Sequence, residues 1–122
     1  MIFVTADRCR SRLEKLTKLL VSAFPGSTIY QHIDFSHVPR DVLNHKVDAV
    51  FLEAETEQPD GLALMQKLHS QKPELPIFIL SKTNSLYKEA VAAGTSGYFV
   101  LPDNETHLLE AIRSATNKES TP

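Results

Sequence analysis

The sequence has one cysteine, Cys9, and no tryptophan. A single thiol excludes an intramolecular disulfide, and 122 residues that are 42% hydrophobic can form a core without one. No apolar run reaches the roughly 18 residues of a membrane-spanning helix. The first residues, MIFVTADR, have no basic segment before an apolar stretch, which does not fit a signal peptide. We therefore expect a cytoplasmic protein without a membrane span.

Basic charge and glycine are also scarce. The net charge is -2, and the sequence has no basic stripe beyond the short cluster of Arg8, Arg10 and Arg12, so no direct nucleic-acid contact is expected. None of the four glycines forms a G-x-G-x-x-G motif, which disfavours a dinucleotide site. The five histidines show no metal-ligand spacing, which disfavours zinc.

What the sequence does contain is a regular alternation of short apolar runs and amphipathic segments. The helical segments keep their leucines on one face, and Pro25-Gly26 and Gly94 end two of them. The expected strands are 2–4, 27–33, 47–52, 77–80 and 98–101. The expected helices run from 8 to 24, from 36 to 43, from 60 to 68, from 84 or 85 to 93, and from 104 to 115.

Five strand-helix units predict an α/β fold: a doubly wound, five-stranded parallel sheet in the order 2-1-3-4-5. Residues 1–117 would form this domain, and 118–122 a polar tail or the start of a linker. Ligand sites in such folds lie beyond the carboxyl ends of the strands, where strands one and three are neighbours. The residues predicted at these ends are Asp7, Glu53, Ser81 and Leu101.

Several segments, in this order and spacing, resemble a response-regulator receiver domain of the CheY-like type. They are IFVTAD, PDGLALM, PIFILS and AGTSGYFVLP. The resemblance implies two acids that hold Mg²⁺, a phosphoacceptor aspartate, and a hydroxyl and a lysine that bind phosphoryl oxygens. By position, Asp7 matches the second acid and Glu53 the phosphoacceptor. Ser81 matches the hydroxyl switch, and Tyr98 the aromatic residue that moves with it.

Three positions depart from that pattern. Ala6 stands where the first acid belongs, and Leu101 stands before Pro102 where the lysine belongs. Glu53 displaces its carboxylate by about 1.5 Å, one C–C bond, relative to aspartate, and misplacements of about 1 Å can cost about 100-fold in rate. Loss of the lysine removes an electrostatic group of the kind that usually dominates catalysis. Weak Mg²⁺ binding by Asp7 and Glu53 stays open.

These departures predict a pseudo-receiver that is not an enzyme and signals through protein contacts without phosphorylation. Receivers use the region matching Ser85 to Ser114 for dimerisation or output, so a protein partner or a second copy is expected there. An output domain is expected to follow in a longer parent chain. FPGSTIY and GYFVLP are somewhat similar to receivers attached to LytTR-type DNA-binding domains. The alternatives are a working phosphoreceiver that uses Glu53 or another acid, and a flavodoxin-like small-molecule-binding domain.

Three further expectations concern the pocket. Lys82 or Arg8 is expected to replace part of the missing lysine by lying near Asp7 and Glu53. The peptide between Leu101 and Pro102 is expected to be cis. The acids after Glu53, namely Glu55, Glu57 and Asp60, are interpreted as a solvated loop and a helix cap.

Overall fold

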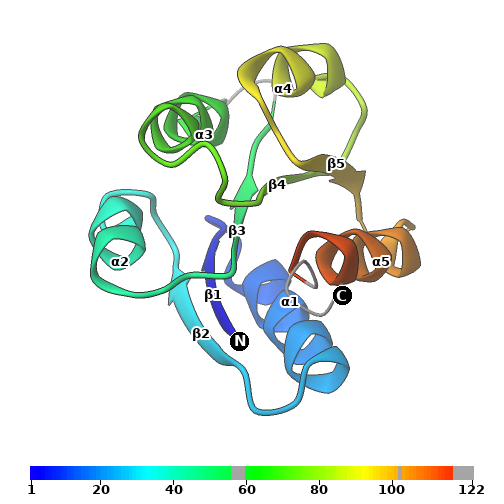
Figure 1. Cartoon of the computed structure of the whole chain (residues 1–122). Coiled ribbons are helices and arrows are strands. Elements are labelled where there is room, and N and C mark those ends of the chain that lie inside the picture. Colours follow the sequence, from blue (N-terminus) through cyan, green and yellow to red (C-terminus); the bar gives the residue numbers. More distant parts are fainter. Residues whose placement is uncertain (56–59, 102, 117–122) are drawn as a thin grey trace.

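The computed structural model describes residues 1–55, 60–101 and 103–116. Strands and helices alternate along the chain, as the sequence predicts (Figure 1). The strands are β1 (Ile2–Ala6), β2 (Thr28–His32), β3 (Ala49–Glu53), β4 (Ile77–Ser81) and β5 (Gly97–Val100). The helices are α1 (Arg10–Ala23), α2 (Val38–Asn44), α3 (Asp60–Gln71), α4 (Tyr87–Ala93) and α5 (Glu105–Thr116).

The five strands form one parallel sheet in the order β2-β1-β3-β4-β5, which confirms the predicted doubly wound fold. The central strands β3 and β4 are buried along their whole length, which explains their nearly unbroken apolar sequences. The register pairs Ala6 with Leu52 and Glu53 with Leu80. The residues that follow β1 and β3 therefore come out side by side at one edge of the sheet.

Helices cover both faces of the sheet: α1 and α5 lie on one face, and α2, α3 and α4 lie on the other (Figure 1). Each face has its own core cluster. Under α1 and α5, three phenylalanines pack in a row, with ring centroids 5.6 Å apart for Phe3 and Phe51 and 5.5 Å apart for Phe51 and Phe78. The other cluster contains Val38 and Val42 of α2, Met65 and Leu68 of α3, and Ala90 of α4. This packing fixes the strand ends that form the site.

Three helix starts differ from the sequence-based expectation, and the first is that of α1, which begins at Arg10 and not at residue 8. Helix α4 begins at Tyr87, because Thr83 and Ser85 hydrogen-bond each other through their hydroxyls, 2.8 Å apart, in a turn before it. Ser36 does not cap α2, because its hydroxyl and N–H both donate to Asp34. Gly94 ends α4 with a φ of 97°, as predicted. Among the described helices, none has the length and apolar character needed to cross a membrane.

Candidate functional site at the carboxyl ends of the strands

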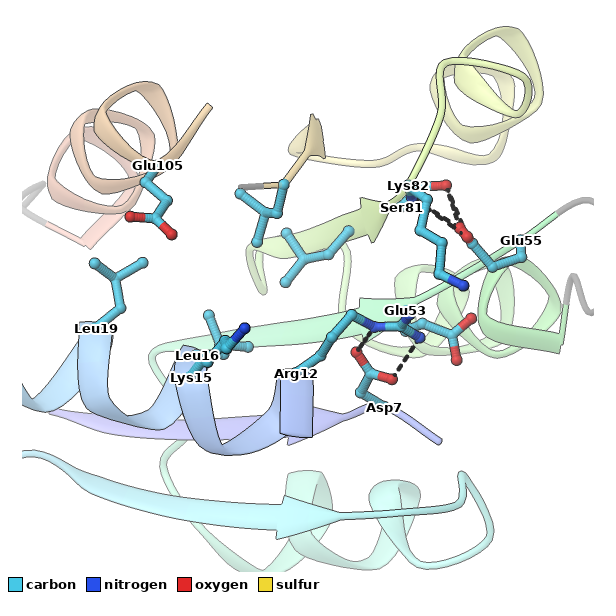
Figure 2. A pocket seen from close by; sticks show the side chains of 12 residues that line it. Asp7, Arg12, Lys15, Leu16, Leu19, Glu53, Glu55, Ser81, Lys82 and Glu105 are labelled. Carbon is cyan, nitrogen blue, oxygen red and sulfur yellow. Dashed lines mark hydrogen bonds and ion pairs between the residues drawn. The ribbon is translucent and has the colours of Figure 1, made fainter. Parts of the chain in front are cut away.

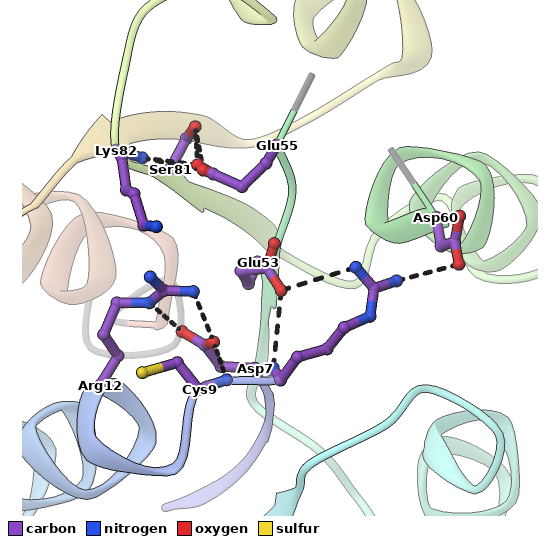
Figure 3. Close-up of polar contacts among 9 residues, drawn as sticks. Asp7, Cys9, Arg12, Glu53, Glu55, Asp60, Ser81 and Lys82 are labelled. Atoms are coloured by element: carbon purple, nitrogen blue, oxygen red, sulfur yellow. Dashed lines mark hydrogen bonds and ion pairs between the residues drawn. The ribbon is translucent and has the colours of Figure 1, made fainter. Parts of the chain in front are cut away.

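The carboxyl ends of β1, β3 and β4 bring three polar residues together, as the predicted topology requires. Asp7, Glu53 and Ser81 are 8%, 4% and 7% exposed, so all three are buried. Figure 3 shows their side chains facing a common space. Buried polar groups need hydrogen-bond partners, and the partners of these three decide what the site can do.

The carboxylate of Asp7 accepts hydrogen bonds on both of its oxygens. Arg12 donates to it twice, from Nε to Oδ2 and from Nη2 to Oδ1, each over 3.0 Å. The backbone N–H of Cys9 also donates to Oδ1, over 2.7 Å. The hydrogen bond to Asp7 is the main reason why the pKa of Arg12 is raised above its usual value. This bidentate pair is a strong type of contact, and it uses both carboxylate oxygens of Asp7.

Arg12 was not among the site residues predicted from the sequence. Arg12 could have been found from its place in the first turn of α1, shortly after Asp7, which follows the end of β1 at Ala6. Arginine occurs at every second position here, as Arg8, Arg10 and Arg12. Which of the three side chains turns back over the strand end depends on where the helix begins, and it begins at Arg10.

Glu53 has weaker partners than Asp7. Its Oε1 accepts a long hydrogen bond of 3.5 Å from the backbone N–H of Arg8, and it lies 4.0 Å from Nη1 of that residue. Burial raises the pKa of Glu53 above its usual value, and the charge of Asp7 raises it further, whereas Arg8 and Arg12 act in the opposite direction. Glu53 is thus a carboxylate whose ionised form is only partly compensated.

Arg8 and Lys82, the two cations expected to replace the missing lysine, make different contacts. Arg8 lies between two acids, because its Nη2 also donates to Asp60 over 2.9 Å. Its guanidinium also lies 4.8 Å from the ring centroid of Phe35. Lys82 contributes its backbone N–H, which donates to Glu55. Within the described residues, the Lys82 ammonium forms no ion pair. Replacement of the lysine by Arg8 stays a prediction.

Glu55 is not a solvated loop acid, and that interpretation of the sequence was wrong. Its Oε1 accepts hydrogen bonds from the hydroxyl of Ser81 and from the backbone N–H of Lys82, both over 2.8 Å. The chain after β3 stays close to the end of β4, as the bond from Ala54 N–H to the Leu80 carbonyl shows. The Glu55 side chain is therefore directed back into the site. Glu57 lies outside the described residues, and Asp60, at the start of α3, binds Arg8.

A chain of hydrogen bonds leads from Glu55 toward the surface of α4 and β5. Ser81 Oγ accepts from the backbone N–H of Thr83 over 3.4 Å, and the Thr83 carbonyl accepts from the hydroxyl of Tyr98. The Tyr98 ring packs edge-on against Tyr87, with centroids 5.9 Å apart. Tyr87 is 53% exposed, so the two predicted switch positions are connected to an accessible part of the surface.

Leu101 lies on the α1 side of the site. It packs against the core cluster of that face, and its N–H donates to the Ser81 carbonyl over 3.2 Å. Its side chain and three other leucines, Leu16, Leu19 and Leu80, line a hollow beside the polar cluster (Figure 2). The expected cis peptide cannot be compared, since Pro102 lies outside the described residues.

The residues fit a magnesium ion poorly. Among the described residues, no three metal-ligating side chains come together. Both oxygens of Asp7 already accept from Arg12, and Ala6 offers no ligand atom. Mg²⁺ needs oxygen ligands in nearly ideal octahedral positions, and here a guanidinium stands next to the carboxylate that would bind it.

Comparison with solved structures supports the fold, whereas the two sequence comparisons find no match. No family model matches the chain, and no curated protein matches it by sequence. Solved structures do match. The receiver domain of a DNA-binding response regulator from Colwellia psychrerythraea has a TM-score of 0.84 and 19% identity over 97% of this chain and 99% of its own. A two-component response regulator from Clostridium difficile has a TM-score of 0.82 and 20% identity over 99% of both chains.

A third match is the signal receiver domain of an HD domain-containing protein from Pseudomonas fluorescens, with a TM-score of 0.80 and 24% identity over 99% of this chain and 98% of its own. The fold of this chain is therefore that of the CheY-like receiver domains. At these identities the likeness concerns the fold alone, since one fold can carry many functions.

Proposed function

We propose that this chain is a receiver-type signalling domain that acts without phosphoryl transfer. One observation carries the proposal. The Ser81 hydroxyl, which the resemblance assigns to a phosphoryl oxygen, donates instead to the carboxylate of Glu55. Glu55 also accepts a hydrogen bond from the backbone N–H of Lys82. Two hydrogen-bond donors of the site therefore bind the Glu55 carboxylate, an anion that belongs to the chain itself.

The other positions support the same function. Leu101 places an apolar side chain where a cation would neutralise the incoming charge, and Arg12 holds the single acid that follows β1. Glu53 has a raised pKa and lies next to a guanidinium already shared with Asp60. Leu101 works against transfer of a phosphoryl group to Glu53, because that transfer needs positive charge positioned on the phosphoryl oxygens. The raised pKa of Glu53 acts in the same direction, because it disfavours the ionised carboxylate that would attack the phosphorus.

The output would be a protein contact on the surface from Ser85 to Ser114. Helix α4 there exposes Tyr87 and Val91, which are 53% and 54% exposed. Tyr87 contacts Tyr98, the last residue of the hydrogen-bonded chain from Glu55. A protein partner or a second copy of the chain would bind one fixed form of this surface. A DNA-binding output domain, as in the Colwellia protein, would follow in a longer parent chain.

The test is a mass measurement after incubation with acetyl phosphate and Mg²⁺. The expected result is no added phosphoryl group. As a matched control, the triple variant Ala6→Asp, Glu53→Asp, Leu101→Lys restores the acids and the lysine that the resemblance implies, and labelling of this variant would show that the conditions support transfer. A gain of one phosphoryl group by the native chain that Glu53→Gln abolishes would overturn the proposal and favour a working phosphoreceiver.

A further inference from the structure

Glu55 is positioned by backbone contacts before and after it in the chain. The N–H of Ala54 donates to the carbonyl of Leu80 over 3.1 Å, which holds the residues after β3 beside the end of β4. Helix α3 then begins so close to β3 that a Cβ atom at Gly61 would clash with the carbonyl oxygen of Glu53. A side chain whose backbone is already in place loses less conformational freedom when it binds, which favours a persistent contact.

Among the described residues, the donors to the Glu55 carboxylate are neutral. Its Oε1 accepts from the Ser81 hydroxyl and from the backbone N–H of Lys82, both over 2.8 Å. The carboxylate forms no ion pair within the described part of the chain, and Figure 3 shows the Lys82 side chain extending away from it, toward Arg12. Hydrogen bonds to an ionised acceptor are stronger than those between neutral groups, so Glu55 fixes the direction of the Ser81 hydroxyl.

Thr83 connects Ser81 with Tyr98. The backbone N–H of Thr83 donates to Ser81 Oγ over 3.4 Å, and its carbonyl accepts from the Tyr98 hydroxyl. The ring of Tyr98 in turn packs edge-on against Tyr87, which is 53% exposed. The bond at Thr83 is long, whereas the bond from Ser81 to Glu55 is short and has a charged acceptor. The position of the Ser81 hydroxyl therefore follows Glu55, and Thr83 and the two tyrosines follow Ser81.

We propose that Glu55 is a built-in ligand that sets the form of the partner surface. While its carboxylate binds Ser81 and Lys82, Tyr98 and Tyr87 stay in the form that a partner recognises, and loss of this contact releases them. This role rests on the proposed function and adds to it the group that sets the state of the surface in place of an added phosphoryl group. Because coupling between two sites is reciprocal, a partner bound at Tyr87 would also strengthen the contact at Glu55.

The experiment uses the isotope-labelled variant Glu55→Ala, which lacks the CH₂–COO⁻ group that acetate can supply. The NMR signals of Thr83, Tyr98 and Tyr87 should shift in this variant, and acetate should return them toward their native positions in a saturable way. Acetamide has the same shape without the charge and should act about tenfold more weakly, the loss of one charge-assisted contact. Sodium chloride at the same ionic strength should not return the signals.

Matched controls locate the effect at Glu55. The native chain should show no change in the three signals when acetate is added, since Glu55 already occupies the two donors. Glu74→Ala, a change at an exposed acid, should leave the three signals in place. The double variant Glu55→Ala, Ser81→Ala also lacks the hydroxyl donor, so it should bind acetate about tenfold more weakly than Glu55→Ala alone.

Unchanged signals of Tyr98 and Tyr87 in Glu55→Ala would overturn this role, and so would shifts that acetate leaves in place or that acetamide reverses equally well. If Glu55→Ala is unfolded, Glu55→Gln provides the test, because its neutral amide should shift the same signals, and unchanged signals would again overturn the role. No phosphodonor is present in these measurements. A mass gain by the native chain with a phosphodonor would refute the proposed function, whereas unresponsive signals in Glu55→Ala would refute the role of Glu55 and leave the mass result standing.

Discussion

Ser81 and Glu55 lie 26 residues apart in the sequence, and the Ser81 hydroxyl donates to the Glu55 carboxylate over 2.8 Å. Ser81 ends β4, and Glu55 lies two residues after the end of β3. The contact joins the ends of two neighbouring strands. It places the negative charge of the Glu55 carboxylate next to the Ser81 hydroxyl and the Lys82 N–H, which both donate to it.

Glu55→Gln should weaken the hydrogen bonds that the Ser81 hydroxyl and the Lys82 N–H donate to this side chain, because a neutral amide replaces a charged acceptor. We expect the free energy of unfolding to fall by about 1–2 kcal/mol, within the range for hydrogen bonds to charged groups. Urea denaturation measures this change, and the exposed Glu74→Gln serves as control. The amide signals of Thr83 and Tyr98 should also shift in the Glu55 variant, and unchanged signals would contradict the hydrogen-bonded chain.

Glu53 should make stability depend on pH in the direction opposite to most acids. Its folded pKa is raised above the ordinary 4.5, first by burial and then by Asp7. The native state therefore binds the Glu53 proton more tightly than the unfolded state does. This contribution is complete below pH 4.5 and is lost as the pH rises through the folded pKa.

The measurement is unfolding by urea at several pH values from 4.5 upward, for the native chain and for Glu53→Gln. The native chain should lose stability relative to the variant as the pH rises. Asp34 does not interfere, because its pKa is lowered below 3.8 and its opposite contribution is lost only at more acidic pH. Parallel curves for the two proteins would contradict the assignment.

Arg12→Gln should leave Asp7 buried, with the Cys9 N–H as its remaining hydrogen-bond donor among the described residues. The Arg12 side chain is 35% exposed, so solvent screens the pair in part, and we expect a loss of about 1–3 kcal/mol. Arg10→Gln, in the same turn and exposed, should change stability by less than about 0.5 kcal/mol. A double-mutant cycle with Asp7→Asn isolates the pair, and a coupling energy near zero would show that the geometry overstates the contact.

Tyr98→Phe should remove the hydrogen bond to the Thr83 carbonyl and keep the ring contact with Tyr87. The expected loss is about 0.5–1.5 kcal/mol, measured by thermal or urea unfolding. Tyr87→Phe keeps the same ring pair and should leave stability nearly unchanged. An equal loss of stability in the two variants would assign the effect to ring packing. Tyr98 would then not belong to the series of hydrogen bonds that begins at Glu55.

The sequence predicted the fold and the strand ends because both depend on periodicity and topology. Apolar runs such as the one ending at Glu53 fix the strands, and the strand order then places Asp7 beside Glu53. The roles of Glu55 and Arg12 could not be predicted in this way. Each depends on the direction of a long side chain just beyond a regular element, where strand and helix periods no longer apply.

The position of Leu101 also bears on how readily substitutions could introduce phosphoryl transfer into this domain. Arg12 holds Asp7, Glu55 holds Ser81, and Leu101 packs with the core leucines of α1. A lysine introduced at position 101 alone would bring an ammonium into an apolar hollow, while the carboxylate and the hydroxyl beside it stay engaged. Single substitutions toward the receiver pattern would then be destabilising or without effect, and phosphoryl transfer would need several substitutions together.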